Sequence, residues 1–212
     1  MQRNIKKNKF NFVILYGSTR KKRLGIRFAE YINMQIKNKG HKSFIIDPLV
    51  VKLPLLDKRY ADFEKSKTPE NIKNVQKILN KSDAFVIVSA EYNHMPPPAL
   101  INIFNYYYSE FNRKPSCVCT YSSGDFAGIR VQSPLRAMLS QLGCPPIKFG
   151  MYQPKVSRKI LQKLQHLQQL ILGRILPFVE VLLVPNQYIY ILLGTHQLRP
   201  KSLSYTCSEQ QL

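Results

Sequence analysis

The chain has 212 residues, an ordinary apolar fraction of 44% and a formal net charge of +20. This length is typical of one globular domain that can bury its own core. The charge predicts attraction to phosphorylated ligands or polyanions, although a lysine-biased surface would give the same total. No RNP-like, zinc-finger or helix-turn-helix signature accompanies the lysines, so nucleic acid is a secondary hypothesis. The basic N-terminus lacks the apolar region and cleavage site of a secretory signal.

In chain order, the apolar run 11–16 predicts a first strand, and helical spacing of apolar residues predicts a helix over 24–38. A short strand follows at 43–46, and the proline-containing stretch 48–68 reads as a long loop with at most short helical turns. Thr68 is expected to cap the next helix, with Pro69 at its first position and its end near residue 80.

Residues 84–89 are continuously apolar, which is typical of a central strand buried on both faces of a parallel sheet. The remaining elements are expected to be helices over 98–109 and 129–142 and strands over 116–121 and 146–152. Strands and helices thus alternate five times. This predicts an α/β fold with a doubly wound, five-stranded parallel sheet and helices on both faces.

The chain carries four cysteines, at positions 117, 119, 144 and 207. Their spacing fits neither a zinc site nor a redox pair, so we expect no metal site. Buried free thiols in a reducing cytosol are the simplest interpretation.

The first strand ends at a small cationic turn, Gly17-Ser18-Thr19-Arg20, which opens the first helix. Gly17 permits a tight turn, while the two hydroxyls, the arginine fork and the helix N-terminus can donate to an anion. The pattern predicts a phosphate site. An ordinary strand-to-helix turn with solvated lysines is the alternative. In a doubly wound sheet this loop should meet the loops 90–96 and 121–128 at one crevice.

Together these loops resemble the NAD(P)H-dependent FMN reductase family of flavodoxin-like quinone, azo-dye and chromate reductases. The matching segments are Gly17-Ser-Thr-Arg20 with Arg23-Leu24-Gly25, Glu91-Tyr92-Asn93-His94 followed by Pro98-Ala-Leu-Ile-Asn102, and Tyr121-Ser122-Ser123-Gly124 followed by Gly128-Ile-Arg130. The resemblance covers residues 10–158 and occurs in the order and spacing of the family.

The resemblance implies that the first loop holds the FMN phosphate, the second follows the flavin and ribityl chain, and the third meets the pyrimidine edge. The cofactor-binding residues would be Gly17, Ser18, Thr19, Arg20, Arg23 (or Lys22), Leu24, Gly25, Glu91, Tyr92, Asn93, His94, Tyr121, Ser122, Ser123 and Gly124. Alternatively, His94 is a surface residue, Tyr92 packs under its loop and Asn93 caps the turn. The aromatic run Tyr106–Tyr108 is interpreted as core and dimer contact rather than a substrate site.

The implied activity is that of an NAD(P)H-dependent oxidoreductase that passes a hydride through FMN to a quinone-like acceptor. The flavin carries the chemistry, so no protein residue is expected to be catalytic. A cytoplasmic homodimer or higher homo-oligomer is expected. Two alternatives are a flavin-binding, redox-sensing partner protein without turnover, and a basic protein that binds nucleic acid or a membrane surface.

The expected domain spans residues 10–158. Residues 159–212 form an atypical continuation in which a helix over 155–172 is followed by an apolar and basic tail. Two prolines and a glutamate interrupt the apolar stretch 175–193, so it is a poor membrane span. A divergent tail, an altered reading frame and an added partner-binding or membrane-associating segment all remain open.

Overall fold

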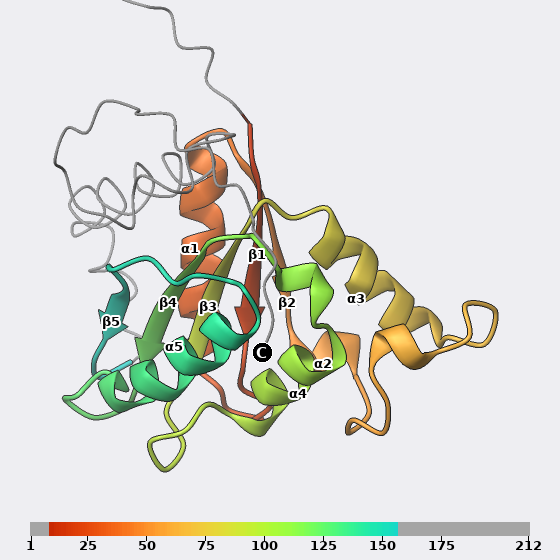
Figure 1. Ribbon diagram of the computed structural model, residues 1–212. Helices are drawn as coiled ribbons and strands as arrows, with labels where there is room; N and C mark the ends of the chain where they lie inside the picture. The colour runs from red at the N-terminus through yellow and green to blue at the C-terminus, as the bar shows by residue number, and fades with distance from the viewer. Residues whose placement is uncertain (1–8, 157–212) are drawn as a thin grey trace, which may run out of the picture.

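The computed structural model describes residues 9–156 and contains a five-stranded, wholly parallel sheet in the order β2-β1-β3-β4-β5 (Figure 1). The strands are β1 (Asn11–Tyr16), β2 (Lys42–Ile46), β3 (Ala84–Ala90), β4 (Ser116–Tyr121) and β5 (Met151–Gln153). This is the flavodoxin-like order, and it confirms the predicted fold class. The expected helix over 155–172 and the tail over 159–212 extend outside the described residues.

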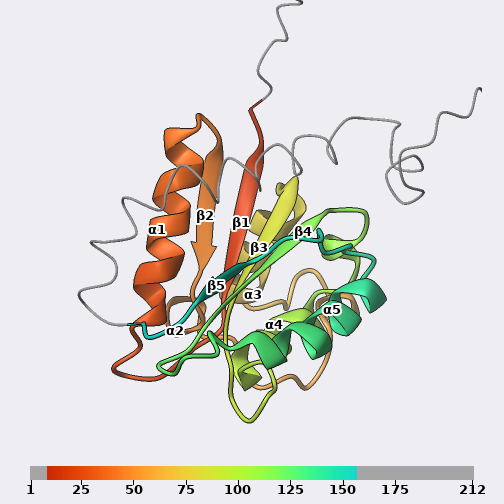
Figure 2. The same cartoon turned by 90° about the vertical axis from the view of Figure 1, so that its left-hand side faces the viewer.

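Helices cover both faces of the sheet (Figure 2). The α-helices are α1 (Gly25–Asn38), α2 (Pro48–Val51), α3 (Glu70–Asn80), α4 (Pro98–Tyr106) and α5 (Gln132–Gln141), with short 3-10 turns at Tyr60–Asp62, Ser109–Phe111 and Ile129–Val131. Within residues 9–156, no helix is long and apolar enough to cross a membrane.

The sheet separates two apolar clusters. One joins α1 to the face that carries Phe12, Ile14 and Tyr16, and the other joins α3, α4 and α5 to the face that carries Val13 and Leu15. Alternate residues of β1 therefore enter different clusters, as the period of a strand requires. All seven residues of β3 are buried, which confirms its predicted central place. Because β3 is buried on both faces, only its ends can contribute to a site.

Several boundaries differ from the sequence prediction. Helix α3 begins at Glu70 with Pro69 at its N-cap, because the Thr68 hydroxyl donates to the Glu64 carbonyl instead of capping the helix. Helix α4 ends at Tyr106, where the chain turns extended, and α5 is preceded by a 3-10 turn. The extended start at Pro146 makes only an isolated bridge to Ser116, so the last strand is shorter than expected.

The aromatic run Tyr106–Tyr108 at the end of α4 belongs to the core, as the sequence predicted. Tyr106 and Tyr107 are buried, and the Tyr107 hydroxyl donates to the Ile72 carbonyl of α3 at 3.0 Å. Tyr108 is 44% exposed and donates to the Gln141 carbonyl. The run therefore fixes α3 and α5 around the end of α4 and leaves only its last member at the surface.

The three described cysteines, Cys117, Cys119 and Cys144, are free and buried, as expected. The hydrogen bond with Cys119 and burial raise the pKa of the Cys117 thiol, and burial raises the pKa of the Cys144 thiol to about 12. We expect these thiols to resist a thiol reagent at pH 8 until the protein is denatured, because thiolate is the reactive form. Peptide mapping of the labelled protein measures this, and labelling of Cys117 or Cys144 in the native protein would contradict it.

The same pKa shift predicts a pH effect on stability. The Cys144 thiol keeps its proton in the folded chain at pH values where the unfolded chain loses it. The contribution of the Cys144 thiol to the free energy of unfolding is therefore fully present below its unfolded pKa of 9.0, and it is lost as the pH rises to its folded pKa of about 12. A Cys144→Ala variant should show a smaller fall in unfolding free energy over this range, measured by urea titration.

Candidate functional site

A cleft of about 490 Å³ opens beyond the carboxyl ends of β1, β3 and β4. It is lined by segments of the three loops that the sequence singled out, together with Gly25 at the start of α1 and Val156. Four cationic residues line one side, namely Arg20, Lys21, Lys22 and Arg23. The cleft therefore combines a positive side with the hydroxyl and backbone groups of three strand ends, as a site for a phosphorylated ligand requires.

The first loop is anchored at both ends. The Gly17 amide donates to the Val88 carbonyl of β3 at 3.2 Å, and the Arg23 amide donates to the Arg20 carbonyl at 3.2 Å. Ser18 is buried, and its hydroxyl accepts from the Arg20 amide at 3.4 Å. Thr19 and Arg20 are exposed. The backbone of the loop is thus held in place while the Arg20 guanidinium stays available to a ligand.

Helix α1 begins at the cleft without a cap. Its N-cap residue, Leu24, has no side-chain oxygen, and the first turn contains no acidic residue. Leu24 and Gly25 both line the cleft. The positive end of the helix dipole and the amides at Gly25 and Ile26 therefore lie where an anion in the cleft could bind them, with no carboxylate in the first turn to take that place.

Phenolic hydroxyls surround Ser18. Its hydroxyl is 2.9 Å from the hydroxyl of Tyr92, and the Tyr121 hydroxyl donates to that of Tyr16 at 3.1 Å. Burial raises the pKa of both Tyr16 and Tyr121, so these phenols keep their protons well above neutral pH. Tyr16 and Tyr121 therefore add no negative charge beside an anion bound in the cleft.

The second loop is a tight turn over Tyr92–Met95. The Tyr92 and Met95 amides each donate to the other residue's carbonyl at 3.0 Å, and Asn93 and His94 both have positive φ values, of 53° and 65°. These are the features of a type I′ turn. Asn93 and His94 occupy its exposed tip, outside the cleft lining, while Glu91 and Tyr92 line the cleft.

The third loop is tied to the second through Glu91. Its carboxylate accepts from the Arg130 amide at 3.0 Å and lies 3.6 Å from the Arg130 guanidinium. Gly128 allows this approach, because it has a φ of 69° and a Cβ there would lie 2.9 Å from the Tyr121 carbonyl. Glu91 is thus engaged in holding the two loops together.

The structure brings most of the expected cofactor residues to one cleft. Those in the lining are Ser18, Arg20, Arg23, Leu24, Gly25, Glu91, Tyr92, Tyr121, Ser122 and Ser123. Those outside the lining are Gly17, Thr19, Asn93, His94 and Gly124. Gly17 lies beneath the loop, where a Cβ would meet Leu100 and Pro97 at 3.1 and 3.3 Å.

Sequence reasoning missed two participants. Asp47 forms a two-pronged ion pair with the Arg23 guanidinium, which raises the pKa of Arg23 chiefly through that hydrogen bond. Tyr16 lies beneath that guanidinium, 5.2 Å from its carbon to the ring centroid. Asp followed by Pro at the end of β2 is a helix N-cap signal, but the sequence contains no sign of its partner in the first loop.

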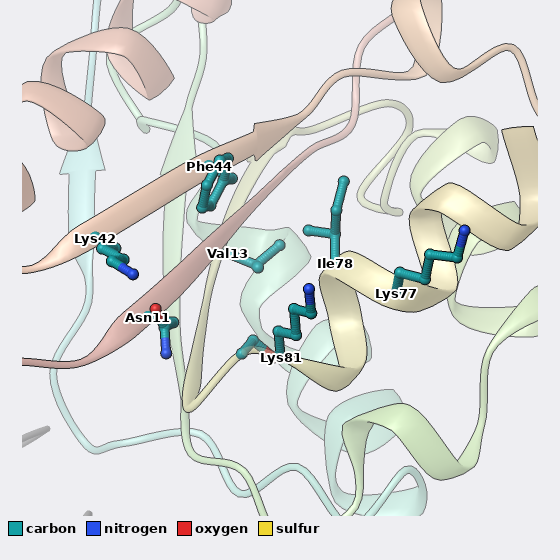
Figure 3. A pocket seen from close by; sticks show the side chains of 8 residues that line it. Asn11, Val13, Lys42, Phe44, Lys77, Ile78 and Lys81 are labelled. Atoms are coloured by element: carbon teal, nitrogen blue, oxygen red, sulfur yellow. The ribbon is translucent and has the colours of Figure 1, made fainter.

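A second hollow, of about 320 Å³, lies on the face between β2, β1 and α3 (Figure 3). Phe44, which pairs with Val13 in the sheet, is 55% exposed there, and Val13 and Ile78 lie nearby. Lys42, Lys77 and Lys81 also line the hollow. The lysine side chains do not converge on one point in Figure 3, so this hollow lacks the directed donors of the first cleft.

Comparisons with known proteins agree with this geometry. Residues 10–152 match the sequence model of a family described as NADPH-dependent FMN reductase. The NAD(P)H-dependent FMN reductase LOT6 of Saccharomyces cerevisiae is 28% identical over 145 residues, which are 61% of this chain and 73% of that protein.

Two solved structures share the fold. One is the flavoenzyme NAD(P)H:acceptor oxidoreductase FerB of Paracoccus denitrificans, with a TM-score of 0.63, 17% identity, and coverage of 82% of this chain and 95% of that one. The other is an NAD(P)H:quinone oxidoreductase of Methanothermobacter marburgensis, with a TM-score of 0.58, 12% identity, and coverage of 80% and 100%.

Proposed function

The chain belongs to the NADPH-dependent FMN reductase family, and from that premise we propose that its cationic cleft holds FMN for reduction of a quinone-like acceptor. It is an oxidoreductase with FMN as cofactor and NAD(P)H as co-substrate. The observation that carries the proposal is the meeting of three strand-end loops and an uncapped helix N-terminus at one cleft.

The donor set of the cleft fits a phosphorylated flavin. We assign the phosphate to the Ser18 hydroxyl, the Arg20 guanidinium and the first-turn amides that begin at Gly25, with Lys21 and Lys22 at the open side. Thr19 and Gly17 shape this loop. Both the positive charge and the uncapped helix favour the phosphate over a neutral ligand.

The other two loops are assigned to the flavin. The backbone amides of Ser123 and Gly124 are assigned to its pyrimidine edge, because the Ser122 amide already donates to the Gln153 carbonyl at 3.2 Å. The second loop follows the ring and ribityl chain through Glu91 and Tyr92, which line the cleft. FMN supplies the hydride-transfer chemistry when bound, and donors near its N1 stabilise the reduced form. The protein's own part is to bind, orient and tune, so we assign no catalytic acid, base or nucleophile.

The positive field of the cleft favours NADPH over NADH, because NADPH carries an additional phosphate. A quinone-like acceptor is supported by the structural relative named as an NAD(P)H:quinone oxidoreductase. The free described thiols support a reducing, cytoplasmic location. We treat residues 10–158 as the FMN-binding domain, with residues 159–212 as an atypical continuation.

A homodimer is part of the proposal. Pro54 and Leu56 are held against α4 by the Asn102 side chain, at 2.8 and 2.9 Å, and this leaves Leu55 between them 85% exposed. Tyr108, two residues after α4, is also exposed. We assign these two exposed apolar side chains to the contact between subunits. Sedimentation equilibrium of the full chain measures the subunit number.

The first test is an absorbance spectrum of the purified chain with FMN, followed by NADPH without oxygen and then a quinone. We expect bound-flavin bands that bleach with NADPH and return with the quinone. Bands that persist with NADPH would instead indicate a flavin-binding partner protein without turnover.

The third interpretation, a polyanion binder, has a different signature: salt-dependent binding to an oligonucleotide and no flavin affinity.

The variant Lys42→Gln/Lys77→Gln/Lys81→Gln removes three charges around the second hollow. We expect it to bind FMN as the wild type does, measured by flavin fluorescence, because none of the three residues lines the cleft. A substantial loss of FMN affinity would move the cofactor site to the second hollow.

A further inference from the structure

Arg23 is the one arginine of the first loop whose donors are directed into the protein. Nη1 and Nη2 each contact one carboxylate oxygen of Asp47, and Nη1 also donates to the Ser18 carbonyl at 3.0 Å. The side chains of Arg23 and Asp47 are only 14% and 11% exposed. A fork that is already bidentate on a carboxylate has few donors left for a phosphate.

Asp47 is itself fixed from the other side. It is the N-cap of α2, and its Oδ1 accepts from the Leu49 amide at 3.0 Å. The carboxylate therefore connects the segment after β2, through Arg23, to the backbone of the phosphate loop at Ser18. Separating the two side chains would leave a mostly buried charge without its partner, which is energetically costly. The pair therefore favours the one loop arrangement in which the two side chains stay in contact.

Ser18 links the Arg23 contact to the groups that would bind a phosphate. Its carbonyl accepts from Arg23, while its hydroxyl meets the Arg20 amide and the Tyr92 hydroxyl. A shift of the Ser18 backbone would move that hydroxyl and the attachment point of the Arg20 side chain together. The orientation of both groups thus depends on the Arg23 contact.

We propose that Arg23 and Asp47 form a positioning pair: Asp47 holds Arg23 on the Ser18 carbonyl, and the pair orients the phosphate donors without touching the phosphate. This inference rests on the proposed binding of FMN in the cleft. It differs from the family resemblance, under which Arg23 itself would contact the phosphate. In that case Asp47 would only neutralise part of the attraction.

The two possibilities predict opposite effects of Asp47→Asn. Asparagine is as good an N-cap as aspartate, so α2 is retained while the ion pair is lost. If the pair positions the loop, Asp47→Asn and Arg23→Gln each weaken FMN binding by about tenfold, and the double variant is no weaker than either single one. Arg23→Lys does not restore affinity, because an ammonium cannot form the two-pronged contact.

The experiment measures dissociation constants for FMN and for riboflavin, which lacks the phosphate, in the full-length chain by fluorescence titration. We expect the riboflavin constant to be the same in all variants. Asp57→Asn is the matched control, since it removes one exposed carboxylate outside the cleft and should leave both constants unchanged.

Unchanged or tighter FMN binding by Asp47→Asn, with weaker binding by Arg23→Gln, would overturn the inference in favour of direct contact. Equal losses for FMN and riboflavin would overturn it in favour of general damage to the fold. A wild-type chain that binds neither flavin would overturn the proposed function, and this inference with it.

Discussion

Arg20→Ala should weaken FMN binding by roughly 1.5–3 kcal/mol, the contribution of a charge-assisted hydrogen bond to a phosphate. Arg20 is exposed at the cleft, and no salt bridge within residues 9–156 engages its guanidinium. The guanidinium lies 6.0 Å from the Tyr92 ring centroid, a contact loose enough to be exchanged for a ligand. Its guanidinium is therefore available to a phosphate in the cleft.

The corresponding dissociation constant should rise by between about tenfold and about 150-fold, measured by quenching of flavin fluorescence. Arg27→Ala is the matched control, because it removes the same charge from an exposed position on α1 outside the cleft. An equal rise in the FMN dissociation constant for both substitutions would mean that FMN binding depends only on the net charge of the protein. Riboflavin affinity should not change in either variant.

Gly25→Ala should lower both stability and flavin affinity. A Cβ at Gly25 would overlap the ring of Tyr121 at Cζ, Cε2 and the hydroxyl. That ring is buried, with its centroid 6.3 Å from that of the stacked Tyr16 ring and 6.5 Å from that of Phe28, which it meets edge-on. The Tyr121 ring therefore has little room to move away. Overpacking of this kind costs about 1–3 kcal/mol of unfolding free energy.

Urea titration of the Tyr121→Ala background isolates this clash. Gly25→Ala should have little further effect there, because the ring that it would overlap is gone. Gly124→Ala is the control glycine: the nearest atom to its Cβ would be the Ser122 hydroxyl at 4.0 Å, and it should be close to neutral. An undiminished effect of Gly25→Ala in the Tyr121→Ala background would show that the α1 backbone, not the tyrosine, is responsible.

Side-chain partners explain where the sequence prediction and the structure differ. Thr68 has the residue type of an N-cap, but its hydroxyl finds the Glu64 carbonyl, a partner in a loop that has no periodic pattern. Arg23 has the residue type of a phosphate ligand, yet it pairs with Asp47, 24 positions away. The partner of Thr68 is four positions away and that of Arg23 is 24 positions away, and in neither case does the residue type alone show which partner is chosen.

The second loop shows the same division. The Glu-Tyr-Asn-His segment was correctly located at the end of β3, and Glu91 and Tyr92 line the cleft. Reciprocal backbone hydrogen bonds between Tyr92 and Met95 close the turn and carry Asn93 and His94 to its exposed tip. Turn geometry decides which side chains of a motif enter a site, and the sequence of the motif does not reveal that geometry.

The sequence alone determined the alternation of strands and helices, the central place of β3 and the three loops at the carboxyl ends. These follow from hydrophobic periodicity and parallel-sheet topology, which are local or general properties. Only the tertiary structure decided that Arg23 is held by Asp47, that Tyr121 fills the space at Gly25 and that Glu91 joins two loops. These contacts depend on the distance and direction between residues far apart in the chain, and packing alone brings them together.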